Sequence, residues 1–169
     1  MDYGLMSSSS DLILRFAQPA DSNVLFDLIK GLAEYEQLSQ AVTGDALALK
    51  EHLFGSPKYV EAVLAEYPGQ VVGFALFFYN YSTFLTKPGI YLEDLFVLPQ
   101  YRRQGIGKAL LSKLAQIAIE RNCGRLEWSV LDWNESAQAF YRSMGANILN
   151  DWRICRVTEK AMQQLANKT

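Results

Sequence analysis

The run VVGFALFFY, residues 71–79, constrains the fold of this chain more than any other segment. Its valines and aromatic residues favour a β-strand, and its apolar side chains at successive positions indicate that both faces of the strand are buried. The turn signal Tyr67-Pro68-Gly69 precedes it, and a second strand-like run covers residues 59–66. The sequence therefore predicts a hairpin of strands at 59–66 and 70–79, with the second strand in the middle of a sheet.

Shorter apolar patterns predict the other elements of what we expect to be one mixed α/β domain over residues 12–169, after a disordered leader at 1–11. Further strands are expected at 12–17, 90–97, 125–131 and 152–157. Helices are expected after a cap at Asp21 or Ser22, from a cap at Thr43 to Phe54, and over residues 104–120, 134–144 and 159–166. The helix at 104–120 is expected to bury Ile106, Leu110, Leu114, Ile117 and Ile119.

Composition excludes several classes of function. The 169 residues carry a formal net charge of −2, which argues against a general nucleic-acid binder. Two cysteines without a CxxC motif indicate reduced thiols in a cytoplasmic protein, and the single histidine, His52, argues against a structural zinc site and against a Ser–His–Asp triad. No apolar run reaches the ~18 residues of a transmembrane helix, so a membrane is not expected as a partner. The cysteine and histidine counts mean that no metal is expected either.

The segment YRRQGIGKALL, residues 101–111, joins a predicted strand to a predicted helix. It lacks the third glycine of a dinucleotide fingerprint, because Leu110 stands there, and its glycines are too close together for a P-loop. The first amides of a helix nevertheless attract anions, and Arg102, Arg103 and Lys108 add positive charge. By itself the loop is equally compatible with a pyrophosphate site and with a tight turn between solvated arginines.

The residues around this loop resemble a known family. Arg102-x-x-Gly105-x-Gly107 after a strand matches the R/Q-x-x-G-x-G/A acetyl-CoA motif of the GNAT N-acetyltransferases. YLEDLFVLPQYRRQGIGKALL and LDWNESAQAFYRSMGA, preceded by LAEYEQLS and FGSP, resemble the spermidine/spermine (diamine) acetyltransferase branch, and LDWN is closer to its thialysine-acetylating relatives. The resemblance implies a GNAT-type α/β fold, with a mixed, mostly antiparallel central sheet flanked by helices. It also implies transfer of the acetyl group of acetyl-CoA to a primary amine.

By this resemblance, three segments hold acetyl-CoA. The strand before the loop offers backbone groups to the pantetheine arm, the loop wraps the pyrophosphate mostly with amides, and the start of a later helix contacts the other end of the arm. The residues implied are Leu95, Phe96 and Val97 for the arm, Arg102, Arg103, Gln104, Gly105, Ile106, Gly107 and Lys108 for the pyrophosphate, and Asn134, Glu135, Ser136, Ala137 and Tyr141 on the later helix.

Two residues are expected to act in the chemistry. Tyr141 matches the family's tyrosine near the sulfur, where a phenol of pKa ~10 can protonate a leaving thiolate; its structural alternative is a buried pair with Phe140. The substrate ammonium must lose a proton, and Glu93 is favoured as substrate ligand and possible base, directly or through a water. Strand alternation puts Glu93 and Asp94 on opposite faces, so one can face the substrate while the other is solvated or paired.

A small polyamine, diamine or lysine-like substrate needs spaced acidic or aromatic contacts. The residues expected to supply them are Tyr35, Glu36, Glu93, Glu127, Trp128, Ser129 and Trp152, with Asp132 and Asp151 as weaker candidates and a core position as the alternative for Trp152. Neither cysteine lies in a nucleophile motif, so we expect direct transfer in a ternary complex. A protein or peptide amine acceptor and a non-catalytic acetyl-CoA-binding regulatory module are the alternatives. The resemblance also implies a homodimer.

Overall fold

The computed structural model describes residues 12–168, so the leader expected at residues 1–11 lies outside the described part of the chain. The chain forms two compact units, one up to Ser129 and one from Val130 onward. The single domain expected over residues 12–169 stays a prediction. No helix within residues 12–168 is both long enough and apolar enough to cross a membrane.

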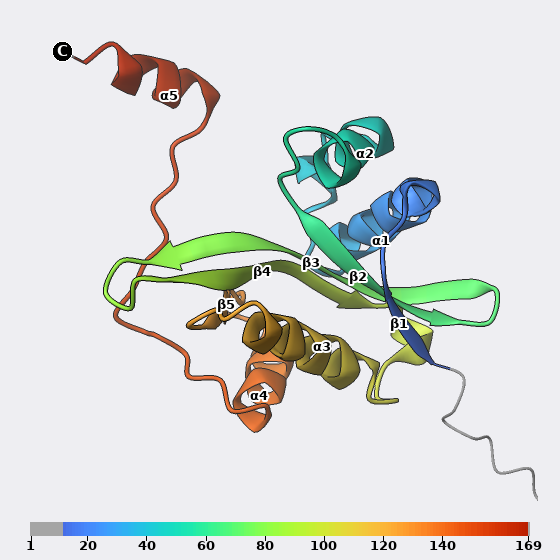
Figure 1. The fold of residues 1–169 in the computed structure, drawn as a ribbon. Coiled ribbons are helices and arrows are strands. Elements are labelled where there is room, and N and C mark those ends of the chain that lie inside the picture. Colours follow the sequence, from blue (N-terminus) through green and yellow to red (C-terminus); the bar gives the residue numbers. More distant parts are fainter. Residues whose placement is uncertain (1–11, 169) are drawn as a thin grey trace, which may run out of the picture. The chain divides into compact units, whose positions relative to one another are not determined.

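The first unit contains a five-stranded sheet in the order β1-β2-β3-β4-β5, which Figure 1 shows as one open, twisted layer. The strands are β1 (Ile13–Phe16), β2 (Glu61–Tyr67), β3 (Gln70–Ser82), β4 (Lys87–Val97) and β5 (Leu126–Trp128). Strands β1 to β4 pair antiparallel, and β5 pairs parallel to β4. The predicted hairpin and the central place of β3 are confirmed, and so is the mixed, mostly antiparallel sheet. The strand expected at 125–131 is shorter than predicted.

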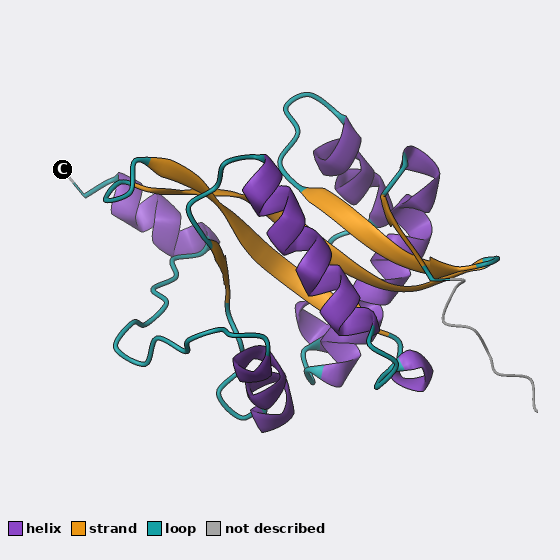
Figure 2. Ribbon diagram, turned by 60° about the horizontal axis from the view of Figure 1, so that its bottom comes forward, coloured by secondary structure: helices purple, strands orange, loops and turns teal. Residues whose placement is uncertain are grey.

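Helices cover both faces of this sheet (Figure 2). Helices α1 (Ser22–Tyr35) and α2 (Ala46–Phe54) lie on one face, and α3 (Ile106–Glu120) lies on the other. The N-cap predicted at Thr43 is wrong, because the Asp45 carboxylate accepts the Ala48 amide at 2.8 Å and starts α2 there. The burial of Ile119 is also wrong: it is 78% exposed, since a residue two positions after buried Ile117 points to the opposite side of a helix.

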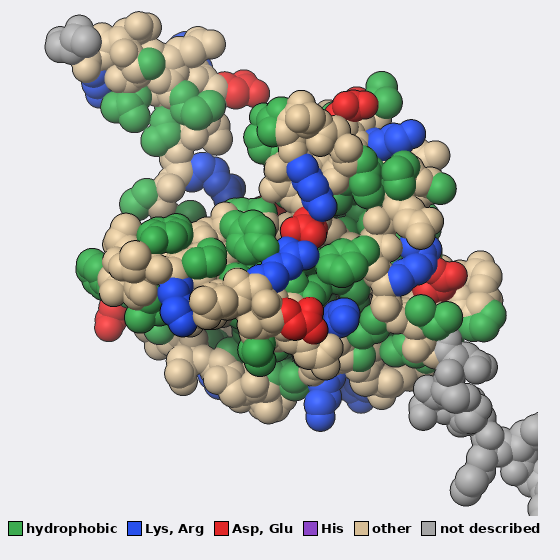
Figure 3. Space-filling view, viewed as in Figure 1, with side chains coloured by type: hydrophobic (Ala, Val, Ile, Leu, Met, Phe, Trp, Pro, Cys, Tyr) green, Lys and Arg blue, Asp and Glu red, His purple; other side chains and the backbone are tan. Residues whose placement is uncertain are grey.

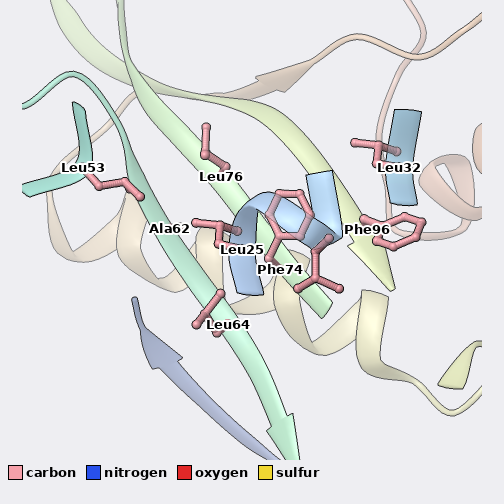
Figure 4. Close-up of a cluster of buried hydrophobic side chains, with 9 residues drawn as sticks. Leu25, Leu32, Leu53, Ala62, Leu64, Phe74, Leu76 and Phe96 are labelled. Carbon is pink, nitrogen blue, oxygen red and sulfur yellow. The ribbon is translucent and has the colours of Figure 1, made fainter. Parts of the chain in front are cut away.

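Alternation along β3 divides the core into two layers. Phe74 and Leu76 face α1 and α2, where they belong to one buried cluster with Leu25 and Phe96 (Figure 4). The intervening side chains point to the α3 face, where the buried residues of α3 are Ile106, Leu110, Leu111, Leu114, Ile117 and Ala118.

The connections and the surface complete the first unit. Short 3₁₀ helices of three residues lie at Pro19–Asp21, Ser39–Ala41 and Pro99–Tyr101. In the space-filling view, basic and acidic side chains are interspersed between hydrophobic ones (Figure 3).

The second unit contains helices α4 (Glu135–Ser143) and α5 (Glu159–Ala166), joined by an irregular segment. Both helices were predicted, within a residue or so at each end. The strand predicted at 152–157 is wrong: these residues belong to no strand of the described chain, and Trp152 is 80% exposed. Apolar and β-branched side chains favour a strand only where a neighbouring strand pairs with it, so propensity alone does not create one.

Candidate functional site

The loop between β4 and α3 forms the first part of the site. Gly105 is the N-cap of α3 and has φ +81°, a left-handed conformation that favours glycine. A Cβ built there would meet nothing within 4 Å, so the space beside it is open. Among the described residues no side chain caps this helix start, while Ile106 is buried and anchors it. The first amides of α3 are therefore positioned to receive an anion such as a pyrophosphate.

The charged side chains of this loop differ in direction. Arg103 and Lys108 are exposed, and Arg103 takes a left-handed φ of 62°. Gln104 is also exposed and donates from its amide to the Gln100 carbonyl at 3.4 Å. Arg102 instead turns back: its Nε donates to the Val97 carbonyl at 2.9 Å, and its guanidinium carbon lies 4.4 Å from the centre of the Tyr35 ring.

The end of β4 forms the second part. The parallel ladder between β4 and β5 joins only Ile90–Leu92 to Leu126–Trp128. From Glu93 to Val97, β4 has no β5 partner within the described residues, which leaves one backbone edge of this segment without a neighbouring strand. The Phe96 side chain is buried in the core, while Leu95 and Val97 are half-buried, so the strand would contact a ligand mainly through its backbone.

A β-bulge in β4 brings three carboxylates together. Leu76 pairs with Asp94, but the next residue of β3, Phe77, pairs with Leu92, so Glu93 is the extra residue. Asp94 therefore shares the face of Leu76, where α1 ends at Tyr35 and Glu36 follows. Burial, and then the negative charges of Glu93 and Glu36, raise the pKa of Asp94 to about 6. Burial also raises the pKa of Glu36.

This carboxylate cluster, Glu36, Glu93 and Asp94, can bind a cation and exchange a proton near neutral pH. Sequence reasoning placed Glu36 and Glu93 in the site but assigned Asp94 to solvent or a partner ion. The bulge changes this assignment, because an extra residue interrupts alternation and re-aims the side chains beside it. The adjacent acids in YLEDLF were the available signal, but the bulge itself depends on pairing with β3.

Strand β5 extends this face. The Glu127 carboxylate accepts the Asn80 amide at 2.7 Å and pairs with the Arg125 guanidinium at 2.8 Å, so its charge is partly compensated. The Ser129 hydroxyl lies 2.7 Å from the Tyr91 hydroxyl, and Trp128 is half-buried. Sequence reasoning missed Tyr91, which also stacks on Phe78 with ring centres 5.2 Å apart, because aromatic residues in a strand usually serve the core.

In the second unit, helix α4 carries the remaining predicted residues. Buried Asn134 caps the helix by accepting the Ala137 amide at 3.1 Å, and Glu135 and Ser136 are exposed in its first turn. Tyr141 lies in the last turn of α4, half-buried, with its ring centre 5.3 Å from that of Phe140. A Schellman-type end fixes this turn: the Ala146 amide donates to the Tyr141 carbonyl at 3.1 Å, and Gly145 has φ +90°.

The acidic and aromatic candidates elsewhere in this unit are exposed. They are Asp132, Asp151 and Trp152. The side-chain amide of Gln138 donates to the backbone carbonyl of Asp132 at 2.8 Å. Their exposure leaves them available to a ligand or to a partner surface, and the segment that carries Trp152 has no regular structure before Glu159.

Known acetyltransferases are similar to this chain in sequence. The model of the acetyltransferase (GNAT) family matches residues 29–146. The chain is 38% identical to thialysine N-epsilon-acetyltransferase of Bos taurus over 168 residues, covering 93% of this chain and 98% of that protein. It is 50% identical to L-ornithine N5-acetyltransferase NATA1 of Arabidopsis thaliana over 95 residues, which cover 56% of this chain and 42% of the relative. An integron cassette protein from V. cholerae has a similar fold, with a TM-score of 0.78 at 24% identity over 94% of this chain and 99% of that one.

Proposed function

The chain belongs to the acetyltransferase (GNAT) family and is an acetyl-CoA-dependent N-acetyltransferase, and on that premise we propose that its acceptor is the primary amine of a lysine-like, diamine or small polyamine substrate. The observation that carries this proposal is the carboxylate cluster at the β4 bulge. An amine side chain reaches an enzyme mainly as an ammonium ion, and three carboxylates at one place attract a compact cation.

Acetyl-CoA supplies the acetyl thioester, and the chain's own residues hold and orient it. We assign the pyrophosphate to the backbone amides from Arg103 to Lys108, because the left-handed Gly105 opens this loop and α3 begins there. Residues Leu95 to Val97 contact the pantetheine arm through the backbone edge of β4 that β5 leaves unpaired. By resemblance, the first turn of α4, from Asn134 to Ala137, contacts the other end of the arm.

The acceptor binds at the carboxylate cluster, beside Tyr35. We assign proton removal from the ammonium to the Glu93–Asp94 pair, directly or through a water. A carboxylate whose pKa is raised is a stronger base than an ordinary aspartate, and at neutral pH a group of pKa about 6 is mostly ionised, so Asp94 is ready to accept the proton. Glu127, Trp128, Ser129 and Trp152 remain proposed contacts for the rest of the acceptor.

Tyr141 is the proposed acid that protonates the leaving thiolate. The acetyl group then passes directly from acetyl-CoA to the amine in a ternary complex, without an acyl-enzyme.

The similarity to a thialysine and an ornithine acetyltransferase favours an acceptor with a terminal amine on a flexible chain. A protein or peptide amine, or a regulatory module without turnover, remains the alternative. The homodimer and the cytoplasmic location also stay predictions, of which the first is testable by light scattering.

The test is a thiol-release assay of the purified protein with acetyl-CoA and a panel of thialysine, lysine, ornithine, diamines, spermidine and a lysine-containing peptide. Mass spectrometry of the products identifies which amine gains an acetyl group. We expect turnover with the free terminal amines. Turnover with the peptide alone would replace the proposed acceptor class, and acetyl-CoA binding without thiol release from any amine would show a non-catalytic module.

A further inference from the structure

Arg102 opens the Arg-x-x-Gly-x-Gly motif, but its guanidinium does not point into the loop that follows it. Its Nε donates to the Val97 carbonyl at 2.9 Å, in a partly buried hydrogen bond that closes the turn between β4 and α3. The guanidinium carbon lies 4.4 Å from the centre of the Tyr35 ring and 5.5 Å from that of Phe96. Both distances are within the range of cation–π contacts, for which the planar guanidinium is well suited.

These contacts connect three parts of the first unit. Phe96 is 4% exposed and belongs to the core cluster, so one ring beside the guanidinium is fixed. Helix α1 packs closely on Phe96, since a Cβ at Gly31 would come within 3.2 Å of its ring. Tyr35 is the last residue of α1 and is 40% exposed, so it receives less support from packing than Phe96 does. A cation at this helix end is also favoured by the helix dipole.

We propose that Arg102 is a positioning residue for the acceptor side of the site: it fixes Tyr35, and with it the start of the carboxylate cluster at Glu36, to the same turn that begins the pyrophosphate loop. The changes in KM that this inference predicts rest on the proposed function, whereas the contact between Arg102 and Tyr35 does not. It replaces the expectation that Arg102 contacts the pyrophosphate, because the Nε–H is donated to the Val97 carbonyl and the guanidinium carbon lies against the Tyr35 ring. The pyrophosphate is left to the amides of the loop and to Arg103 and Lys108.

Two substitutions distinguish a positioning role from a phosphate contact. Arg102→Lys keeps the charge but loses the planar group and the Nε–H, whereas Arg102→Gln loses the charge as well. A positioning role predicts that both raise KM for the amine about fivefold to tenfold, with acetyl-CoA affinity changed less than about twofold in Arg102→Lys. A phosphate contact predicts instead that Arg102→Gln weakens acetyl-CoA binding, measured by calorimetry, while KM for the amine stays constant. The second result would overturn the proposal.

The matched control is Arg156→Lys, an exposed arginine outside the proposed site, which should change neither KM nor acetyl-CoA affinity. A second measurement needs neither turnover nor a folded variant at position 102. In the unsubstituted protein, the Arg102 Nε–H NMR signal should exchange with water at least about tenfold more slowly than that of Arg156, because it is hydrogen-bonded and partly buried. Tyr35→Leu should remove much of this protection, since the ring covers the guanidinium.

Equal exchange rates for the two arginines would overturn the positioning role, whatever the enzyme acetylates. Absence of turnover with every amine of the panel would reject the proposed function, but the exchange measurement would still decide whether Arg102 is held against Tyr35.

Discussion

Glu61 and Asp94 are carboxylates on two strands of the same sheet, and their surroundings are opposite. In the register, Glu61 pairs with Phe77 and Asp94 with Leu76, so the two acids lie on opposite faces. The two oxygens of Glu61 accept from the Arg121 guanidinium at 2.7 and 3.0 Å, and the pKa of Glu61 is lowered by this arginine. Asp94 has carboxylates as its charged neighbours, and its pKa is raised to about 6.

The difference separates an acid that supports the fold from one that costs folding energy. Arg121, at the end of α3, also donates to the Tyr79 hydroxyl at 3.0 Å, so the Glu61 ion pair ties β2 and β3 to α3. An acid whose pKa rises on folding is less favourable in the folded state at neutral pH. Strongly shifted acids of this kind concentrate at functional sites, which is why we place the chemistry at Asp94.

The largest expected effect comes from Asp94→Asn. We expect kcat/KM for the amine to fall by about 100-fold or more, because the substitution removes a proton acceptor and a cation ligand. The same change should raise the free energy of unfolding at pH 7.5 by about 2 kcal/mol, since the unfavourable ionised form is no longer buried. Steady-state kinetics and urea denaturation measure the two quantities on one preparation.

The paired control is Glu93→Gln at the neighbouring, exposed position. If Glu93 is the base and Asp94 only a ligand, Glu93→Gln will lower kcat while Asp94→Asn mainly raises KM. An Asp94→Asn enzyme that keeps both its kcat and its KM would remove the functional half of the comparison with Glu61.

Tyr141→Phe tests the proposed general acid, which belongs to neither of the two carboxylate environments. We expect kcat to fall about tenfold to a hundredfold with KM for acetyl-CoA unchanged, because only the proton to the leaving thiolate is lost. The acidic limb of the pH profile of kcat, which we assign to Asp94, should remain in this variant. An unchanged kcat would leave Tyr141 as a structural partner of Phe140.

Whether a feature could be predicted from the sequence depends on how far apart its residues lie in the chain. The loop between β4 and α3 is local: its glycines, its arginines and the helix that follows are adjacent in the chain, so they could be placed before the fold was known. The bulge at Glu93 depends on which residues of β3 pair with β4, and the contact of Arg102 with Tyr35 joins segments far apart in sequence. At residues 152–157 the sequence predicted an element that does not form: these strand-like residues have no strand to pair with in the described chain.

Glu61→Gln tests the structural half of the comparison. We expect the free energy of unfolding at pH 7 to fall by about 1–2 kcal/mol, because the ion pair with Arg121 is half-buried and two-pronged but still partly screened by solvent. For a chain of this size the midpoint of thermal unfolding should fall by roughly 2–8 °C. The kinetic constants should not change, and a loss of activity without a loss of stability would contradict the assignment of Glu61 to the fold.

The smallest expected effect is the pH dependence of stability in the unsubstituted protein. Asp94 has a folded pKa of about 6 against 3.8 for the unperturbed group, so the folded state binds more protons between these values and stability falls as pH rises from about 4 to 6. Glu61 has the opposite sign: its lowered pKa contributes stability that is present above about pH 4.5 and is lost as pH falls through its folded pKa. Between pH 5 and 6 the effect of Asp94 should therefore dominate, and the free energy of unfolding should decrease by about 1 kcal/mol.

Urea denaturation at half-unit pH steps should show this decrease. The decrease should be absent in Asp94→Asn and present in Glu61→Gln. A decrease that persists in Asp94→Asn would move the raised pKa to another acid, with Glu36 the first to test because burial shifts it in the same direction.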